Sequence, residues 1–389
     1  MPVQVSVLGA VAAALLVAAI VAFITTPVVR SLAFKIGAVD VPKDNRRMHN
    51  HPIPRMGGLA IFFGFILSAL IFVPLSTPMR GMLLGGVIIV ILGIFDDIYA
   101  LPALPKFFVQ IVSALVAVLM GNQIDILSNP NIFSSNPYWE LGIWSIPISV
   151  IWIVGITNAV NLIDGLDGLA CGVSTISSMT MLVIALTVAE PDTALLMAAL
   201  AGACIGFLPY NLNPAKIFMG DTGSTFLGFI LATVSIDGLF KSYAIISFAV
   251  PFLMLGLPIF DTCFAIFRRV SHGQSPMAPD RGHIHHRLID MGFSQKQAVA
   301  VLYIISAILG LSAVVLTTTN VLKAMLFLLA LCAAGGVSAK LYLDRVNGRT
   351  QSDPPSQGRT GAQPRKLHQP PSDVAGNDYF FGEEERSDK

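Results

Sequence analysis

Apolar segments long enough to cross a lipid bilayer recur along this 389-residue chain, and they constrain its fold more than any other feature. A helix needs about 20 apolar residues to span the bilayer, and only helices and closed barrels satisfy every backbone hydrogen bond in lipid. The apolar runs are continuous rather than alternating, which excludes a barrel. Charged residues make up only 12% of the chain. We therefore expect an all-α, polytopic membrane helix bundle.

The apolar runs predict about eleven transmembrane helices and two regions of different character. Residues 1–343 form the predicted integral membrane domain, whereas residues 344–389 are rich in Pro, Gly, Ser, Gln and charge and predict a disordered cytoplasmic tail. No internal repeat is evident. The expected helices lie near residues 3–25, 56–75, 82–95, 105–121, 144–157, 169–188, 193–209, 223–239, 245–267, 297–316 and 321–343.

The distribution of positive charge predicts how these helices are oriented. No Lys or Arg precedes the first apolar run, residues 3–29, whose length also disfavours a cleavable signal, and six basic residues follow before residue 56. The positive-inside rule then places the N-terminus outside and the tail in the cytoplasm. The loops at 121–143, 187–192 and 317–320 lack Lys and Arg and fall outside. Residues 122–143 contain short β-prone pieces that suggest a small hairpin there.

Composition also limits the ligand classes and the role of cysteine. The formal net charge is +1, so nothing indicates a nucleic-acid partner. The four cysteines lie in separate apolar segments without the spacing of a metal or redox motif, which favours core packing.

Five polar clusters interrupt the apolar pattern, and the predicted topology places all of them on the cytoplasmic side. Scatter without function would divide them between the two faces, whereas an active site built from cytoplasmic loops requires them on one face. The most informative cluster is NAVNLIDGLDGLA, which follows directly on an apolar helix. The clusters occupy residues 42–58, 95–106, 158–170, 211–225 and 275–288.

Each acidic or basic group in these clusters has a structural and a functional interpretation. Asp96 and Asp97 are adjacent, so they fit either a helix cap or a general base whose pKa is raised by the second carboxylate. Lys106 fits either a lysine reaching the membrane interface or a phosphate ligand. Asp221, within GDTGS, fits either a helix N-cap or a ligand of a hard cation.

The sequence GHIHHR at residues 282–287 resembles a zinc motif, but no cysteine lies nearby. The five clusters offer mainly oxygen ligands, which suit Mg²⁺ or Mn²⁺ better than structural zinc. His and Arg side chains beside a metal-bound diphosphate are better explained as phosphate donors. Asp261 lies inside an apolar run, where a carboxylate is either functional or paired with Arg268 near the helix end.

Together, NAVNLIDGLDGLA, the Asp96–Asp97 pair, GDTGS and HIHH resemble the polyprenyl-phosphate N-acetylhexosamine-1-phosphate transferases, glycosyltransferase family 4. The resemblance extends from about Val39 to Arg287. It implies a multi-pass enzyme of the bacterial plasma membrane, which moves a sugar 1-phosphate from a UDP-sugar to a lipid phosphate and releases UMP.

Within that family, HIHH is similar to the branch that uses UDP-GlcNAc, whereas the phospho-MurNAc-pentapeptide branch usually carries three consecutive histidines. The implied substrates are UDP-N-acetylglucosamine and undecaprenyl phosphate, for the first lipid-linked step of a cell-envelope polysaccharide. Another UDP-N-acetylhexosamine, the MurNAc-pentapeptide donor and, in a different class, an ion-coupled transporter remain alternatives. A homodimer is also left open.

The resemblance implies a role for each matching residue. Mg²⁺, or Mn²⁺, would bind Asp221 and Asn161, and Asp164 and Asp167 would shape the nucleotide or sugar site. Asp96 or Asp97 would deprotonate or orient the lipid phosphate. Direct attack by that phosphate is favoured over a covalent aspartyl intermediate, because a phosphate monoester is already ionised near neutral pH. The expected substrate-binding residues are Lys106, Asn158, Arg281, His283, His285, His286 and Arg287.

Overall fold

The computed structural model describes residues 5–41, 52–128, 138–237, 249–275 and 282–318. The expected helix at 321–343, the expected tail at 344–389 and Arg281 lie outside these ranges.

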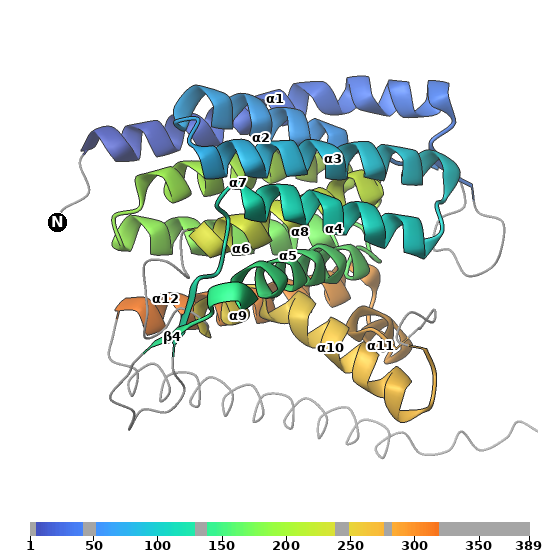
Figure 1. The fold of residues 1–389 in the computed structure, drawn as a ribbon. Helices are drawn as coiled ribbons and strands as arrows, with labels where there is room; N and C mark the ends of the chain where they lie inside the picture. The colour runs from blue at the N-terminus through green and yellow to red at the C-terminus, as the bar shows by residue number, and fades with distance from the viewer. Residues whose placement is uncertain (1–4, 42–51, 129–137, 238–248, 276–281, 319–389) are drawn as a thin grey trace, which may run out of the picture. The chain divides into compact units, whose positions relative to one another are not determined.

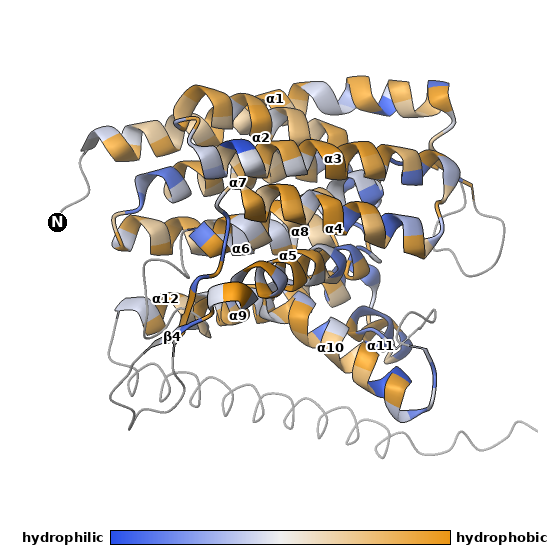
Figure 2. Cartoon of the chain, in the orientation of Figure 1, coloured by the Kyte–Doolittle hydropathy of each residue, from blue (hydrophilic) through white to orange (hydrophobic). Residues whose placement is uncertain are grey.

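The described chain is built almost entirely from helices (Figure 1). Six of them are long and apolar enough to cross a membrane, and two further apolar helices, α2 and α4, are shorter. The long helices are hydrophobic over most of their length, with hydrophilic residues mainly near their ends (Figure 2). The helices are α1 Val5–Ile36, α2 Gly58–Phe72, α3 Thr77–Tyr99, α4 Ala103–Leu119, α5 Ser145–Leu162, α6 Leu169–Thr187, α7 Pro191–Asn211, α8 Gly220–Ser235, α9 Ala249–Met254, α10 Gly256–Ser271, α11 Ile284–Asp290 and α12 Gln295–Thr318, with a 3-10 turn, η1, at Gly142–Trp144.

Most expected helices coincide with observed ones, and the differences have local causes. The first helix continues eleven residues beyond its expected end, through Pro27 to Ile36. The helix expected at 245–267 is divided, because α9 ends at Met254 and α10 begins at Gly256. Pro258 lacks an amide proton and its ring collides with the carbonyl four residues earlier, so a continuous helix is unfavourable at this point.

Two short antiparallel sheets connect helices. β1 Val39–Asp40 pairs with β2 Ile53–Pro54, and Asp40 lies opposite Ile53. β3 Ile126–Ser128 pairs with β4 Tyr138–Glu140, so the hairpin expected within residues 122–143 is present.

Helix α8 forms the centre of the bundle. It packs against α3, α5, α2 and α6, and every residue from Thr222 to Ser235 is buried. Small residues permit this packing: a methyl group added to Gly58 of α2 would collide with the backbone of Gly223. The N-terminus of α8, which carries Asp221, is thereby fixed beside the C-terminal end of α3. This junction positions the polar clusters.

Candidate active site

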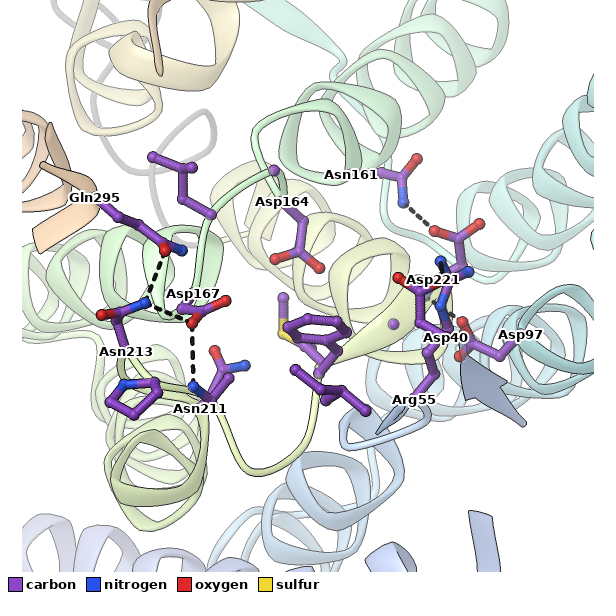
Figure 3. Close-up of a pocket in the computed structure, with 18 of the residues that line it drawn as sticks. Asp40, Arg55, Asp97, Asn161, Asp164, Asp167, Asn211, Asn213, Asp221 and Gln295 are labelled. Carbon is purple, nitrogen blue, oxygen red and sulfur yellow. Dashed lines mark hydrogen bonds and ion pairs between the residues drawn. The ribbon is translucent and has the colours of Figure 1, made fainter. Parts of the chain in front are cut away.

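A cavity of about 570 Å³ lies where the polar clusters meet (Figure 3). Its walls come from the β1–β2 hairpin, the end of α3, the α5–α6 connection, the α7–α8 connection, α11 and the start of α12. The expected convergence of separate clusters is therefore observed among the described residues. The expected site residues that line the cavity are Asp97, Asn161, Asp164, Asp167, Asp221 and His286.

Asp221 presents its carboxylate to the cavity from the first turn of α8. Asn161, at the end of α5, donates its amide to Asp221 Oδ1 at 2.8 Å and to Ser224 Oγ at 2.8 Å. Lys106 Nζ, from α4, lies 3.4 Å from the other carboxylate oxygen. Three helices thus hold one carboxylate in a fixed position at a helix N-terminus, where the helix dipole favours negative charge.

Asp97 is buried and holds the start of α8 rather than projecting into open space. One of its oxygens accepts the Asp221 N–H at 2.9 Å, and the other accepts the Thr222 N–H at 3.1 Å and hydroxyl at 2.6 Å. It therefore acts as an N-cap supplied by another helix.

The neighbouring Asp96 is also buried and has different partners. It accepts the Leu101 N–H at 2.7 Å and Lys106 Nζ at 2.7 Å. Lys106 therefore bridges Asp96 and Asp221, and it is positioned to meet an anion that approaches Asp221.

Asp167 fixes the connection between α7 and α8. Its Oδ2 accepts the side-chain amide of Asn213 at 2.9 Å and the backbone N–H of Ala215 at 3.0 Å. Asn213 also donates to Gln295, at the start of α12, at 2.7 Å. This network joins the α5–α6 connection to two other segments and forms one wall of the cavity (Figure 3).

Asp164 lies between Asn161 and Asp167 and points into the cavity (Figure 3). Burial, together with the negative charges of Asp221 and Asp97, raises the pKa of Asp164 to about 8. The carboxyl is therefore largely protonated at neutral pH when the cavity holds no cation.

The segment GHIHHR is helical from residue 284 rather than a loop, and its histidines have separate environments. His283 Nδ1 lies 2.8 Å from Asp261, whose other oxygen accepts the Ile284 N–H at 2.8 Å. Asp261 thus pairs with His283, while Arg268, the partner suggested by sequence, donates to the Gly282 carbonyl at 2.8 Å.

His285 is buried against Gly165 of the α5–α6 connection, and any β-carbon at Gly165 would collide with its ring. Burial and the neighbouring His286 lower the pKa of His285 to about 4, so this ring is neutral near pH 7. His286 lines the cavity.

Five expected substrate-binding residues among the described residues do not line the cavity, namely Lys106, Asn158, His283, His285 and Arg287. Asn158 donates its amide to Gln110 of α4 at 2.7 Å. The Arg287 guanidinium lies 5.0 Å from the Phe264 ring of α10.

The oxygen-rich cavity fits a divalent cation of the hard type. No group of three His, Cys, Asp or Glu side chains is close enough to hold a metal anywhere in the described ranges. Mg²⁺ usually takes one or two carboxylates and completes its coordination with water and substrate phosphates. Asp221 supplies one such carboxylate, while the Asn161 amide nitrogen donates to it.

Sequence reasoning overlooked several residues of the cavity wall, namely Asp40, Arg55, Asn213 and Gln295. Arg55 and Asn213 belong to polar clusters recognised in the sequence, so their position in those clusters could have identified them as candidate site residues. Asp40 and Gln295 lie at the edges of predicted helices and loops, where sequence gave no such signal.

A bundle of membrane-length helices surrounds a cavity lined by carboxylates and an arginine, and a lysine pairs with one of those carboxylates at a helix N-terminus. This combination defines a class of integral membrane proteins that handle phosphorylated ligands. Residues 79–239 match glycosyl transferase family 4. The chain is 45% identical, over 79% of its length and 85% of the relative, to the probable undecaprenyl-phosphate N-acetylglucosaminyl 1-phosphate transferase of Bacillus subtilis (strain 168). The protein belongs to glycosyl transferase family 4.

Two further relatives show the breadth of this similarity. The decaprenyl-phosphate N-acetylglucosaminephosphotransferase of Mycolicibacterium smegmatis is 36% identical over 77% of this chain and 80% of its own length. The phospho-N-acetylmuramoyl-pentapeptide-transferase of Staphylococcus aureus (strain JH9) is 32% identical over 66% of this chain and 83% of its own length. Of these three relatives, the two named for N-acetylglucosamine have the higher identities.

Proposed function

We propose that the protein transfers GlcNAc-1-phosphate from UDP-GlcNAc to undecaprenyl phosphate. An oxygen of the lipid phosphate attacks the phosphorus that carries the sugar, and the bond to UMP breaks, so that undecaprenyl-diphospho-GlcNAc and UMP are formed. The observation that carries this proposal is a cluster at the N-terminus of α8, in which Asp221 and Asn161 line the cavity and Lys106 pairs with Asp221. The similarity of the chain to an N-acetylglucosaminyl 1-phosphate transferase supports GlcNAc as the transferred sugar.

Mg²⁺, with Mn²⁺ as a substitute, is the proposed cofactor, held by Asp221 and by Asn161 once its amide oxygen turns inward. When bound, the ion neutralises diphosphate charge and stabilises the departing UMP. Lys106 adds positive charge beside Asp221, and the His286 ring can donate a hydrogen bond to a phosphate oxygen in the cavity. Phosphoryl transfer depends mainly on such positioning and charge neutralisation.

Hydrogen bonding within the site supports direct attack over a covalent aspartyl intermediate. Both oxygens of Asp97 already accept hydrogen bonds from the start of α8, and Asp96 is paired with Lys106. A carboxylate held in this way is a weaker nucleophile than an ionised lipid phosphate approaching Lys106. We assign Asp97 to positioning of Asp221, and Asp96 to orientation of Lys106.

An apolar groove of about 440 Å³ between α3 and α4 supports an isoprenoid acceptor. The groove ends beside the charged cluster, because Phe95 adjoins Asp96 and Leu101 donates its N–H to that carboxylate. A phosphate at Lys106 would therefore leave its branched apolar tail in the groove. The lining residues are Ile88, Ile91, Leu92, Phe95, Leu101 and Val109.

Filling the groove tests this acceptor site. Ile91→Trp should raise the KM for undecaprenyl phosphate several-fold and leave the KM for UDP-GlcNAc unchanged. Leu84→Trp, on the same helix and outside the groove, is the matched control, since Leu84 is also exposed. Equal effects of the two substitutions would reject the groove as the acceptor site.

The proposed setting is the bacterial plasma membrane, with about eleven helices and the cavity open to the cytoplasm, where UDP-sugars are available. The N-terminus would then be outside. Six spans of sufficient length within the described residues are compatible with this arrangement.

The direct test is transfer by the purified protein in detergent. Radiolabelled UDP-GlcNAc, undecaprenyl phosphate and Mg²⁺ should give a labelled lipid and UMP, and EDTA should abolish the product. Asp221→Asn should lower turnover by about a hundredfold or more, as expected when an electrostatic contact to the transition state is lost. Asp192→Asn, at the opposite end of α7 from the cavity, is the control.

The phospho-MurNAc-pentapeptide donor is the second candidate, because one relative of that name covers two thirds of the chain. Competition between the two UDP-sugars measures the difference in transition-state affinity directly. A product dominated by the pentapeptide lipid would reject the GlcNAc assignment.

A further inference from the structure

The Arg55 side chain lies on the cavity wall beside the carboxylates and directly follows β2 of the short β1–β2 hairpin. The hairpin register brings Arg55 next to Asp40: the Arg55 N–H donates to the Ala38 carbonyl at 2.9 Å, and the guanidinium lies 3.1 Å from Asp40. Figure 3 shows Arg55 and Asp40 on the same side of the cavity as Asp97 and Asp221.

The hairpin is fixed to the segment that precedes α8. The Phe218 N–H donates to the Pro54 carbonyl at 2.9 Å, and the Phe218 carbonyl accepts the Gly57 N–H at 2.9 Å. The Gly58 N–H donates to the Met219 carbonyl at 2.8 Å. Arg55 is thus attached, through its backbone, to the same structural unit as Asp221, and it does not depend on Asp40 to hold the hairpin in place.

The acidic lining of the cavity makes the positive charge of Arg55 suited to binding phosphate. Five acidic side chains line the wall, at Asp40, Asp97, Asp164, Asp167 and Asp221, and of these Asp164 is largely protonated near pH 7. Within the described ranges, Arg55 is the one Arg or Lys among the lining residues. A ligand with two phosphates is repelled by such a wall unless cations compensate. A guanidinium binds phosphate oxygens through two parallel N–H groups and keeps its charge at all relevant pH values.

We propose that Arg55 binds the diphosphate of the nucleotide donor and that Asp40 holds its guanidinium in place when the donor is absent. The Arg55 side chain is 37% exposed, so a ligand in the cavity can reach it, and an ion pair at such exposure is weak enough to exchange. The proposal rests on the proposed function for the donor, and it adds a donor-binding residue outside the motifs that carry the family resemblance at Asp221 and Asn161.

A purely structural role for the Arg55–Asp40 pair makes the opposite prediction for one variant. If the pair only stabilises the hairpin, removing either partner should weaken donor binding to a similar extent. If Asp40 competes with the diphosphate, its removal should strengthen donor binding. The signs of the two effects therefore separate the explanations.

The experiment measures UDP and uridine binding to the full-length protein in detergent with Mg²⁺, by calorimetry or by competition. Arg55→Gln should weaken UDP binding about tenfold or more, as expected for loss of a charge-assisted contact, and leave uridine binding unchanged. Arg55→Lys should lose less UDP affinity than Arg55→Gln, because the positive charge remains. Asp40→Asn should bind UDP at least as tightly as the unmodified protein. Arg80→Gln, on α3 away from the cavity, is the control.

Unchanged UDP affinity in Arg55→Gln would overturn the proposal, as would equal losses of UDP affinity in Arg55→Gln and Asp40→Asn. Thermal unfolding of each variant is recorded alongside, and a loss of UDP affinity that follows a loss of fold, with uridine binding lost in parallel, also counts against it. Binding of UDP does not require turnover, so absence of lipid product in the unmodified protein would reject the proposed function instead.

Discussion

At the scale of single residues, the acidic side chains of the site divide into two groups by what their oxygens contact. Asp97 and Asp167 accept backbone N–H groups and hold segments of the cavity wall together. Asp164 and Asp221 present oxygens to the cavity. Composition and spacing do not distinguish the two groups. Asp164 and Asp167 lie in the same NAVNLIDGLDGLA cluster, yet they belong to different groups.

Substitution of Asp97 should therefore affect folding as well as activity. Asp97→Ala leaves the amides of Asp221 and Thr222 and the Thr222 hydroxyl without their acceptor, at about 1–3 kcal/mol for each unsatisfied group. We expect a clear drop in unfolding temperature in detergent. Asp97→Asn should lower the unfolding temperature less than Asp97→Ala, because one acceptor oxygen remains. Asp221→Asn should retain the unmodified unfolding temperature while losing transfer, and similar thermal losses in all three would contradict this division.

The raised pKa of Asp164 predicts a pH dependence of stability. Between its ordinary pKa of about 4 and its folded pKa of about 8, the unfolded chain releases the proton while the native state keeps it. Stability should therefore fall as pH rises through this interval, in the absence of nucleotide and divalent cation. Thermal unfolding at pH 5, 6, 7 and 8 should show this slope, and Asp164→Asn should make it less steep between pH 6 and 8.

The control for that slope is Asp192→Asn, which removes an exposed carboxyl at the start of α7. It should keep the slope of the unmodified protein. If Asp164→Asn shows the same decline with pH as the control, the carboxyl is not held protonated by its surroundings.

At the scale of helices, sequence predicts the long apolar elements well and the short amphipathic ones poorly. The runs of apolar residues dictate α2, α6 and α12, because lipid leaves the backbone no alternative to the helix. Helix α11 has only seven residues, too few for a periodic signal, and its place depends on contacts of His283 and His285 with distant segments. The break before α10 follows from Pro258, a signal present in the sequence.

The contact between α11 and the α5–α6 connection can be tested at Gly165. A methyl group there would collide with the His285 ring, which is buried and cannot move freely. Gly165→Ala should lower turnover and unfolding temperature, whereas Gly155→Ala on α5 should change neither, because nothing lies near its added methyl. Gly165→Ala combined with His285→Ala should recover stability, since the second change removes the collision. Failure of the pair to recover stability would show that the glycine serves another purpose.

At the scale of the whole described chain, the meeting of separate loops is predictable but their detailed arrangement is not. Topology alone assigns the polar clusters to one end of the bundle, and the cavity confirms that they meet. Which side chains face the cavity is decided by tertiary contacts. Asn158 turns to Gln110, while Arg55 reaches the wall through a hairpin whose strands have two residues each. Such contacts leave no periodic trace in the sequence.

The orientation of the bundle gives the last prediction. Helix α7 carries Asn211 at the cavity and begins at Pro191, about 30 Å away at 1.5 Å per residue. A cytoplasmic cavity therefore requires the start of α7 to be outside. Single cysteines are placed at Asp192 and at Gln274, which follows α10 toward GHIHHR and is exposed, in an active variant whose native cysteines are alanine. An impermeant thiol reagent applied to intact cells should label Asp192→Cys and spare Gln274→Cys, and permeabilised cells should allow both to react. The reverse pattern would place the cavity outside, where a UDP-sugar is not supplied, and it would reject the positive-inside assignment together with the proposed donor.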